Sequence, residues 1–162
     1  MGPRWMLAWV CICAFGLAVG CGTSERCGPS EALVVRAIDG DTVELEDGTR
    51  VRYLMIDTPE ITGGKNDCYG EEARAANAAL VEGKTVQLKY DVECEDNYDR
   101  LLAYVFISGQ EINLRMVERG YACVLNIPPN GADRVTEFEA AELEARSHEV
   151  GMWGACEEVA CD

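Results

Sequence analysis

The feature that most constrains the fold of this sequence is a series of short strand-like segments separated by tight turns. Residues 33–38 form a β-branched run, and residues 42–46 alternate polar and apolar side chains. An Asp-Gly pair at 47–48 predicts a hairpin turn, after which residues 50–56 continue as a third strand. Pro59 lies beyond it, and proline supplies no N–H to a central strand. A chain patterned in this way is predicted to form an antiparallel meander.

The order of the later elements points to a small barrel. We expect helices at 70–82, 112–119 and 133–149 and strands at 85–91 and 101–107. Three meandering strands, a helix, two strands and then helices is the order of an OB-type Greek-key barrel. The predicted fold is therefore α+β, a five-stranded OB-fold Greek-key β-barrel with three flanking helices.

The first residues have the character of an export signal. Arg4 gives a basic start, and about fifteen apolar residues follow, fewer than the roughly 20 needed to span a membrane. Small residues then precede Cys21, which resembles the cleavage box of bacterial lipoproteins, although Leu17 stands one position too early. We expect an exported protein, attached to the cell envelope through acylated Cys21. Ordinary secretion and a retained membrane anchor are the alternatives.

A chain of 162 residues has room for one domain besides such a leader. We expect residues 1–20 to be the signal peptide and residues 21–31 a linker. Residues 32–155 would form the folded domain, and residues 156–162 a short tail that contains cysteines. The expected state is a monomer.

The cysteines agree with an oxidising compartment. Of nine, two lie in the leader and Cys21 would carry lipid, which leaves an even number for disulfides. Zinc is the rival, but His148 is the only histidine and no C-x2-C pair occurs. Sequence alone cannot give the pairing of six cysteines. We expect Cys68 to pair with Cys94. Cys27, Cys156 and Cys161 would form a terminal cluster, and Cys123 would stay unpaired.

Charge bears directly on the choice of partner. The chain has 14 basic and 29 acidic residues, a formal net charge of −15. Such acidity opposes long-range attraction to nucleic acid, whose binding normally depends on Lys and Arg. The acidic residues either keep an exported domain soluble, or they require that any phosphate site be local and assisted by a divalent cation. Both interpretations stay open at this point.

Two carboxylates are candidates for binding a cation. Asp41 and Asp57 lie on either side of the second and third expected strands, so antiparallel pairing can bring them together. With the carbonyl of Thr58, they would form an oxygen-only site suited to Ca²⁺. The alternative is an ordinary Asp-Gly-Asp-Thr turn with no metal.

Three further side chains suggest phosphodiester chemistry. Arg52 and Arg100 could hold one phosphate between two guanidinium groups. Glu60 lies close enough to the expected cation to hold an attacking water and to act as its base. The alternatives are arginines paired with surface carboxylates and a solvated loop glutamate.

Beyond these individual signals, the order of the motifs is specific. The motifs include IDGDTV at 38–43, VR at 51–52, IDTPE at 56–60, YG at 69–70, EA at 72–73, DNYDR at 96–100, LAYV at 102–105, Asn113, GYA at 120–122 and GMW at 151–153. Over about residues 33–153 the chain resembles the staphylococcal nuclease (thermonuclease) family. The resemblance implies a Ca²⁺-dependent nuclease that cuts DNA and RNA on the 5′-oxygen side and leaves 3′-phosphate ends.

The resemblance also assigns roles to residues. It implies that Asp41, Asp57 and the Thr58 carbonyl hold calcium, and that Tyr98 lies beside the phosphate. The catalytic residues that it implies are Arg52, Glu60 and Arg100.

The chain departs from the family pattern near this site. Asp99 replaces the usual glycine beside Arg100, so that its carboxylate could compete with phosphate. The base-holding tyrosines of the type enzyme fall at about Asn126 and Pro128. We expect activity with weak substrate binding. The alternatives are a catalytically weak OB-fold module that binds nucleic acid and a disulfide-stapled module of the cell envelope.

Overall fold

The computed structural model describes residue 2 and residues 27–160. Five strands form the barrel: β1 (Glu31–Ala37), β2 (Thr42–Leu45), β3 (Arg50–Tyr53), β5 (Thr85–Lys89) and β6 (Leu101–Ile107). Their order is β3-β2-β1-β5-β6, and a parallel pairing of β3 with β6 closes the barrel. The other pairings between neighbouring strands are antiparallel. The expected five-stranded OB-type barrel is confirmed.

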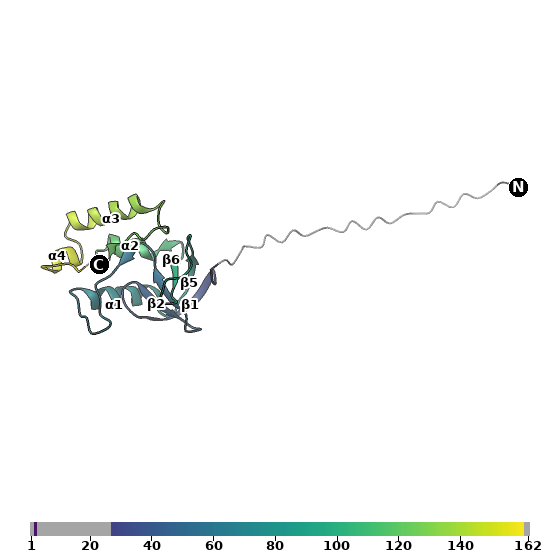
Figure 1. Ribbon diagram of the computed structural model, residues 1–162, viewed down its shortest axis with the longest axis horizontal. Helices are drawn as coiled ribbons and strands as arrows, with labels where there is room; N and C mark the ends of the chain where they lie inside the picture. The colour runs from purple at the N-terminus through teal and green to yellow at the C-terminus, as the bar shows by residue number, and fades with distance from the viewer. Residues whose placement is uncertain (1, 3–26, 161–162) are drawn as a thin grey trace.

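Three helices flank the barrel, as expected, and a short one follows them. They are α1 (Gly70–Val81), α2 (Ile112–Glu118), α3 (Val135–Ser147) and α4 (Met152–Ala155). In Figure 1, α2 lies between α1 and α3, and it contacts both of them as well as β6. The helices therefore cover one side of the barrel.

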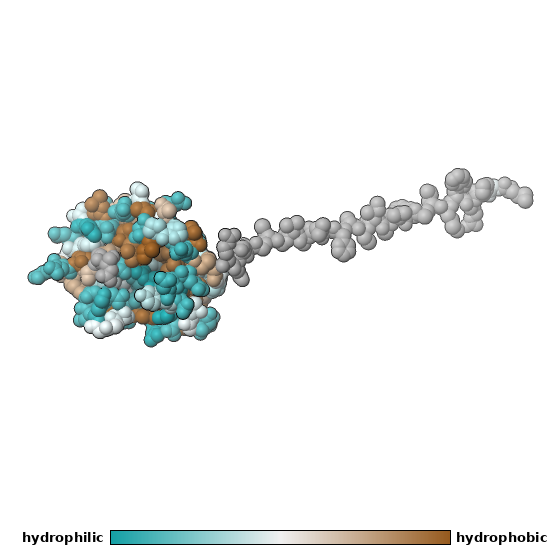
Figure 2. All heavy atoms as spheres, in the orientation of Figure 1, coloured by the Kyte–Doolittle hydropathy of each residue, from teal (hydrophilic) through white to brown (hydrophobic). Residues whose placement is uncertain are grey.

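The core lies inside the barrel and beneath these helices. Apolar side chains of the strands alternate inward, as in β5, where Val86 and Leu88 are buried between exposed neighbours. From α3, Phe138 and Ala145 are buried, while Val135 and Ala141 pack partly buried against the core. Figure 2 shows a surface on which hydrophilic residues surround smaller hydrophobic patches. This burial is the main source of stability for a domain of this size.

The third strand ends earlier than we expected. β3 stops at Tyr53, and Met55 then adopts a φ of 68°, which a non-glycine residue rarely takes. The chain turns there, so Ile56 and Asp57 form the separate strand β4 (Ile56–Asp57) and pair with β8 (Cys123–Val124). The prediction of one strand over 50–56 was wrong because the pattern contains no sign of this turn.

Three short elements were not predicted: β7 (Gln110–Glu111), β8 and α4. Each has four residues or fewer, which is too short for a periodic pattern. Apart from residue 2, the leader lies outside the described residues, as does Cys21, so their expected roles stay predictions. Within the described part of the chain, no helix is long and apolar enough to cross a membrane.

The expected disulfide pairing was wrong. Cys27 pairs with Cys94, and Cys68 pairs with Cys156, with Cα–Cα distances of 5.0 and 6.0 Å. Cys123, expected to be unpaired, is also disulfide-bonded. Cys161 lies outside the described residues. The correct pairs join segments 67 and 88 residues apart, and no local pattern could have indicated that they meet.

Candidate active site

The turn before β2 presents Asp41 to the rest of the site. Thr42 begins β2 and lies opposite Arg52 of β3 in the antiparallel register, so the preceding carboxylate reaches the arginine. Its Oδ1 lies 3.1 Å from the Arg52 Nε and accepts a hydrogen bond from the Thr42 hydroxyl. The side chain is only 6% exposed. Asp41 is therefore a buried carboxylate whose charge is offset by a neighbouring guanidinium.

Thr58 packs directly against this turn. Its backbone N–H and its hydroxyl both donate to the Asp41 Oδ2, at 2.9 and 3.0 Å. A Cβ on Gly40 would lie 2.6 Å from the Thr58 side chain, so this approach requires glycine at position 40. The glycine of the Asp-Gly-Asp motif thus allows two segments 17 residues apart to meet.

Arg52 joins the two predicted calcium ligands. Besides Asp41, it contacts Asp57 through Nη2 at 2.8 Å from Oδ1. Its Nη1 donates to the carbonyls of Tyr53 and Ile56, at 2.8 and 2.6 Å. These bonds span the turn between β3 and β4, which explains how Asp57 comes to lie beside Asp41. One guanidinium therefore organises both carboxylates.

A third carboxylate lies behind this pair and was not among the predicted site residues. Asp39 is 6% exposed, and its Oδ1 accepts the backbone N–H of Asp41. Burial, together with the negative charge of Asp41, raises the pKa of Asp39 to about 7. The Asn77 side-chain nitrogen donates to the Asp39 main-chain carbonyl, and the Asn77 side-chain oxygen accepts a hydrogen bond from the Tyr53 hydroxyl. The only signal in the sequence was its place two residues before Asp41.

The second predicted arginine lies on a hairpin before β6. Arg100 donates through Nε to the Asp96 Oδ2 at 2.7 Å, and its Nη2 is also 2.7 Å from that oxygen. Asp96 additionally accepts the backbone N–H groups of Tyr98 and Arg100. Burial alone would raise the Asp96 pKa, but these bonds and the Arg100 charge outweigh it and lower the pKa. Asp96, and not the neighbouring Asp99, is therefore the carboxylate that holds Arg100.

Both arginines line one pocket of about 370 Å³. Asp96, Glu95 and Glu93 form part of its wall, so negative charge lies beside the arginines. A cavity of this size falls within the usual range for small-ligand sites. The structure thus places Arg52 and Arg100 on one pocket whose surroundings are partly acidic, and their predicted role in holding a phosphate stays a prediction.

Glu60 lies three residues beyond Asp57 and is half-buried. Its carboxylate accepts a hydrogen bond from the Thr62 hydroxyl at 2.6 Å. Its backbone N–H donates to Asp67, whose own N–H donates back to the Glu60 carbonyl. Glu60 does not line the pocket, so the role of Glu60 as a base stays a prediction.

Comparison with known proteins is consistent with this arrangement. The family model described as staphylococcal nuclease homologue matches residues 50–155. The thermonuclease of Staphylococcus intermedius is 35% identical over 126 residues, which cover 75% of this chain and 74% of that protein. The chain belongs to the staphylococcal nuclease family.

Two Bacillus subtilis (strain 168) proteins are similar as well. Endonuclease YncB is 38% identical, with 73% of this chain and 59% of that protein covered. The SPbeta prophage-derived endonuclease YokF is 37% identical, with 73% and 42% covered. This member of the staphylococcal nuclease family thus spans about half the length of these two relatives.

The residues of this family member fit a hard cation. Asp41 and Asp57 contact the same guanidinium, and with the Thr58 main-chain carbonyl they would offer only oxygen donors, which Ca²⁺ prefers. Within residues 27–160, no three His, Cys, Asp or Glu side chains cluster in a way that could hold a metal. A site here would therefore need the main-chain carbonyl and water besides the two carboxylates.

The positions expected to hold a base differ from the family pattern in the structure too. Neither Asn126 nor Pro128 lines the pocket, but Ile127 between them does and is 63% exposed. Tyr98 also lines it and is 70% exposed. Where the family pattern has two base-holding tyrosines, only the aliphatic Ile127 therefore faces the pocket, and Tyr98 of the hairpin is the tyrosine available to a base.

Proposed function

We propose that this chain is a Ca²⁺-dependent nuclease that hydrolyses phosphodiester bonds of DNA and RNA and leaves 3′-phosphate ends. One observation carries the proposal: Arg52 and Arg100 line the same pocket, and Arg52 also bridges Asp41 and Asp57. Two guanidinium groups near one buried and one partly buried carboxylate suit a phosphate bound together with a cation. The similar proteins named endonuclease and thermonuclease support the same reaction class.

The arginines would bind the phosphate and stabilise the transition state. A guanidinium can donate two parallel hydrogen bonds to phosphate oxygens, and it keeps its charge at every physiological pH. Because negative charge builds up on those oxygens during attack, donors fixed in place beforehand lower the barrier. Within the described part of the chain, the Arg100 guanidinium donates to Asp96 alone and keeps N–H groups free for such a pair of bonds to phosphate. Arg52 is fixed by four acceptors, so it would contribute its remaining N–H and its charge.

Glu60 would act as the general base. It would take a proton from water as the water oxygen bonds to phosphorus and the bond from phosphorus to the 5′-oxygen breaks. The leaving oxygen would then take a proton from solvent. The hydrogen bonds to Asp67 and from Thr62 hold the backbone and carboxylate of Glu60, which favours one orientation.

Asp41, Asp57 and the Thr58 carbonyl would hold the calcium ion. The ion would supply positive charge next to the phosphate, which this acidic chain otherwise provides only through its arginines. We further propose that the protein acts after export, bound to the envelope through Cys21 or secreted. Disulfide-bonded cysteines support this location, because disulfides persist in oxidising compartments.

The test is digestion of single-stranded DNA by the mature protein in Ca²⁺ or in EGTA. We expect cleavage in Ca²⁺ only, with products whose 5′ ends can be phosphorylated directly because they carry a free hydroxyl. Glu60→Ala and Arg100→Ala should each lower the rate by at least roughly a hundredfold. Arg74→Ala is the matched control, since Arg74 pairs with Glu71 on the exposed face of α1.

The acidic wall of the pocket favours one alternative, a module that binds nucleic acid weakly without cutting it. Glu93, Glu95 and Asp96 would repel a polyanion next to the arginines. Binding of DNA without calcium-dependent cleavage would support this alternative and contradict the nuclease. Cleavage that both substitutions leave unchanged would instead refute the residue roles.

A further inference from the structure

The hairpin that carries Arg100 has the Cys27–Cys94 disulfide at its root, the point where Cys94 pairs with Leu102. Its two sides meet where the Leu102 N–H donates to the Cys94 carbonyl at 2.8 Å and where Glu95 bridges Leu101. Closer to the tip, the Asp96 N–H donates to the Arg100 carbonyl at 3.0 Å. The hairpin residues between Cys94 and Leu102 supply much of the pocket lining, including Asp96, Tyr98 and Arg100.

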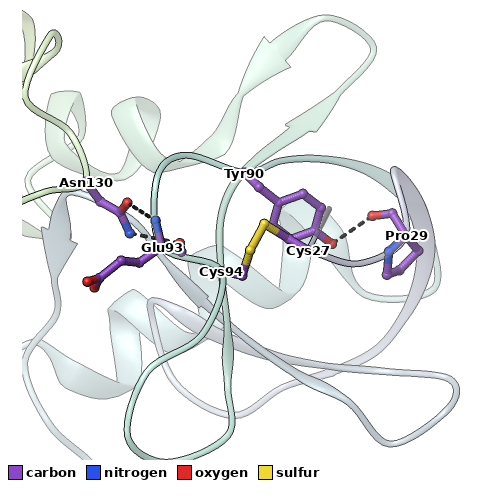
Figure 3. Close-up of a disulfide and its surroundings, with 6 residues drawn as sticks. All are labelled: Cys27, Pro29, Tyr90, Glu93, Cys94 and Asn130. Carbon is purple, nitrogen blue, oxygen red and sulfur yellow. Dashed lines mark hydrogen bonds between the residues drawn. A yellow bond between two sulfur atoms is a disulfide. The ribbon is translucent and has the colours of Figure 1, made fainter. Parts of the chain in front are cut away.

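Two further interactions hold the same root (Figure 3). The Tyr90 hydroxyl donates to the Pro29 carbonyl at 2.8 Å, two residues beyond Cys27. On the other flank, buried Asn130 accepts the Glu93 N–H and donates to the Glu93 carbonyl, at 2.8 and 3.1 Å. The disulfide thus belongs to a set of contacts that fix the segment leading into the hairpin.

The two sides of the hairpin are supported differently. Arg100 leads directly into β6, which pairs with both β3 and β5 and so lies in the closed barrel. Asp96 lies on the other side, which follows the end of β5 at Lys89 and rejoins β6 through the Glu95–Leu101 bridge and the hydrogen bond to the Cys94 carbonyl. The position of the Asp96 carboxylate, and with it the aim of the Arg100 guanidinium, depends on how firmly the root is held.

We propose that the disulfide between Cys27 and Cys94 is a positioning element of the active site, which sets Arg100 through Asp96. It joins the segment before β1 to the root of the catalytic hairpin. This inference rests on the proposed nuclease function. If the proposal holds, full activity requires the oxidised protein. The segment around Cys27 then affects the reaction without contacting the reacting groups.

A double-mutant cycle tests whether the disulfide acts through Asp96. We expect Cys27→Ala with Cys94→Ala to lower kcat about tenfold with KM changed less than about threefold, because a misplaced catalytic group costs rate. In an Asp96→Asn background the same pair should cost less than about twofold, since groups that act in one chain are not additive. A tenfold loss in both backgrounds would overturn the proposal.

The other disulfide provides the matched control. Cys68→Ala with Cys156→Ala also removes a long-range crosslink, but its effect on kcat should be the same with Asp96 or Asn at position 96. Should the first pair of substitutions prevent folding, Tyr90→Phe loosens the same root by one hydrogen bond. It should lower kcat about threefold and lose that effect in the Asp96→Asn background; additivity there would contradict the proposal.

A second readout needs no catalysis. Amide hydrogen exchange of Tyr98 and Arg100, whose N–H groups donate to Asp96, should accelerate at least about tenfold in the Cys27→Ala, Cys94→Ala protein. The Cys68→Ala, Cys156→Ala protein should not show this change. Unchanged exchange in the first pair would refute the positioning role. If the parent protein does not cleave DNA, the proposed function fails, while exchange still tests the positioning on its own.

Discussion

Asp96 holds Arg100 through a single oxygen: its Oδ2 lies 2.7 Å from both the Nε and the Nη2 of the guanidinium. Its other oxygen accepts two backbone N–H groups of the hairpin. The same carboxylate therefore shapes the turn and aims the side chain. The remaining guanidinium N–H groups of Arg100 can face a phosphate in the pocket.

Asp96→Asn should lower kcat about tenfold, because an amide cannot hold the guanidinium with a charge-assisted bond. KM should not rise, since one negative charge leaves the pocket wall. Single-turnover rates and binding of a DNA oligonucleotide measure the two effects separately.

Asp99→Asn is the control for this substitution. Asp99 has a φ of 58°, a conformation that asparagine tolerates as well as aspartate, so the turn should persist. We expect kcat within about twofold of the parent. A larger loss with Asp99→Asn than with Asp96→Asn would mean that Asp99 is the partner of Arg100 during the reaction.

Arg52→Gln should make the stability of the protein strongly dependent on calcium. The substitution leaves Asp41 and Asp57 as neighbouring carboxylates, 6% and 15% exposed, without their shared counter-ion. In EGTA we expect a loss of roughly 3 kcal/mol in the free energy of unfolding, as when one partner of a buried ion pair is removed. Calcium should restore part of it, because the ion supplies the missing positive charge.

Thermal unfolding with and without Ca²⁺ measures this effect. The shift in Tm on adding calcium should be larger for Arg52→Gln than for the parent. Arg74→Gln breaks an exposed pair and should change stability by less than about 1 kcal/mol in either condition. Equal calcium shifts in Arg52→Gln and the parent would argue against a cation site at these carboxylates.

The local pattern of the sequence predicts most of the fold. Alternating residues and an Asp-Gly turn mark β2 and β3, and the alanine-rich face marks α1. The pairing of β3 with β6 joins residues 50 positions apart, such as Val51 and Leu101, and no local signal shows it. Barrel closure therefore follows from the order of elements and not from the strands themselves.

The sequence indicated several members of the candidate site but not its contacts, and it gave little reason to include Asp39. Asp41, Arg52 and Asp57 come together because Met55 takes a left-handed conformation, which its side chain gives no reason to expect. Adjacency in sequence suggested Asp99 as the partner of Arg100. The hairpin instead places position 96 across from position 100, so a residue four positions away makes the contact.

Asp39 should give the calcium-free protein a stability that falls as pH rises towards 8. Its pKa is about 7 in the folded protein, above the unfolded value of 3.8, because burial and Asp41 disfavour its charge more than Arg52 favours it. Between these values the folded state binds the extra proton, so raising pH weakens folding. This contribution is present in full below about pH 4 and is lost progressively up to about pH 7.

Asp39→Asn should remove this dependence. The amide is neutral at every pH and can still accept the Asp41 N–H, so the variant should lose less stability than the parent between pH 5 and pH 8. Urea unfolding in EGTA at the two pH values measures the difference. Asp47→Asn is the control. A hydrogen bond from the Thr49 backbone lowers the pKa of the exposed Asp47 carboxyl, so this group does not titrate between pH 5 and pH 8. A parent no less stable at pH 8 would contradict the assignment.

The Cys68–Cys156 disulfide should contribute to stability more than to turnover. It closes a loop of 88 residues between the segment after Glu60 and the end of α4, and a crosslink of that length stabilises by about 4.6 kcal/mol in the chain-entropy model. Cys68→Ala with Cys156→Ala should therefore lower the free energy of unfolding by roughly 2–4 kcal/mol. Because the Glu60 backbone is also held by Asp67, next to Cys68, we expect kcat to fall only about twofold to threefold at a temperature where the variant stays folded. Urea unfolding and DNA cleavage on the same preparation measure both effects, and a loss of turnover without a loss of stability would show that this crosslink acts on Glu60 itself.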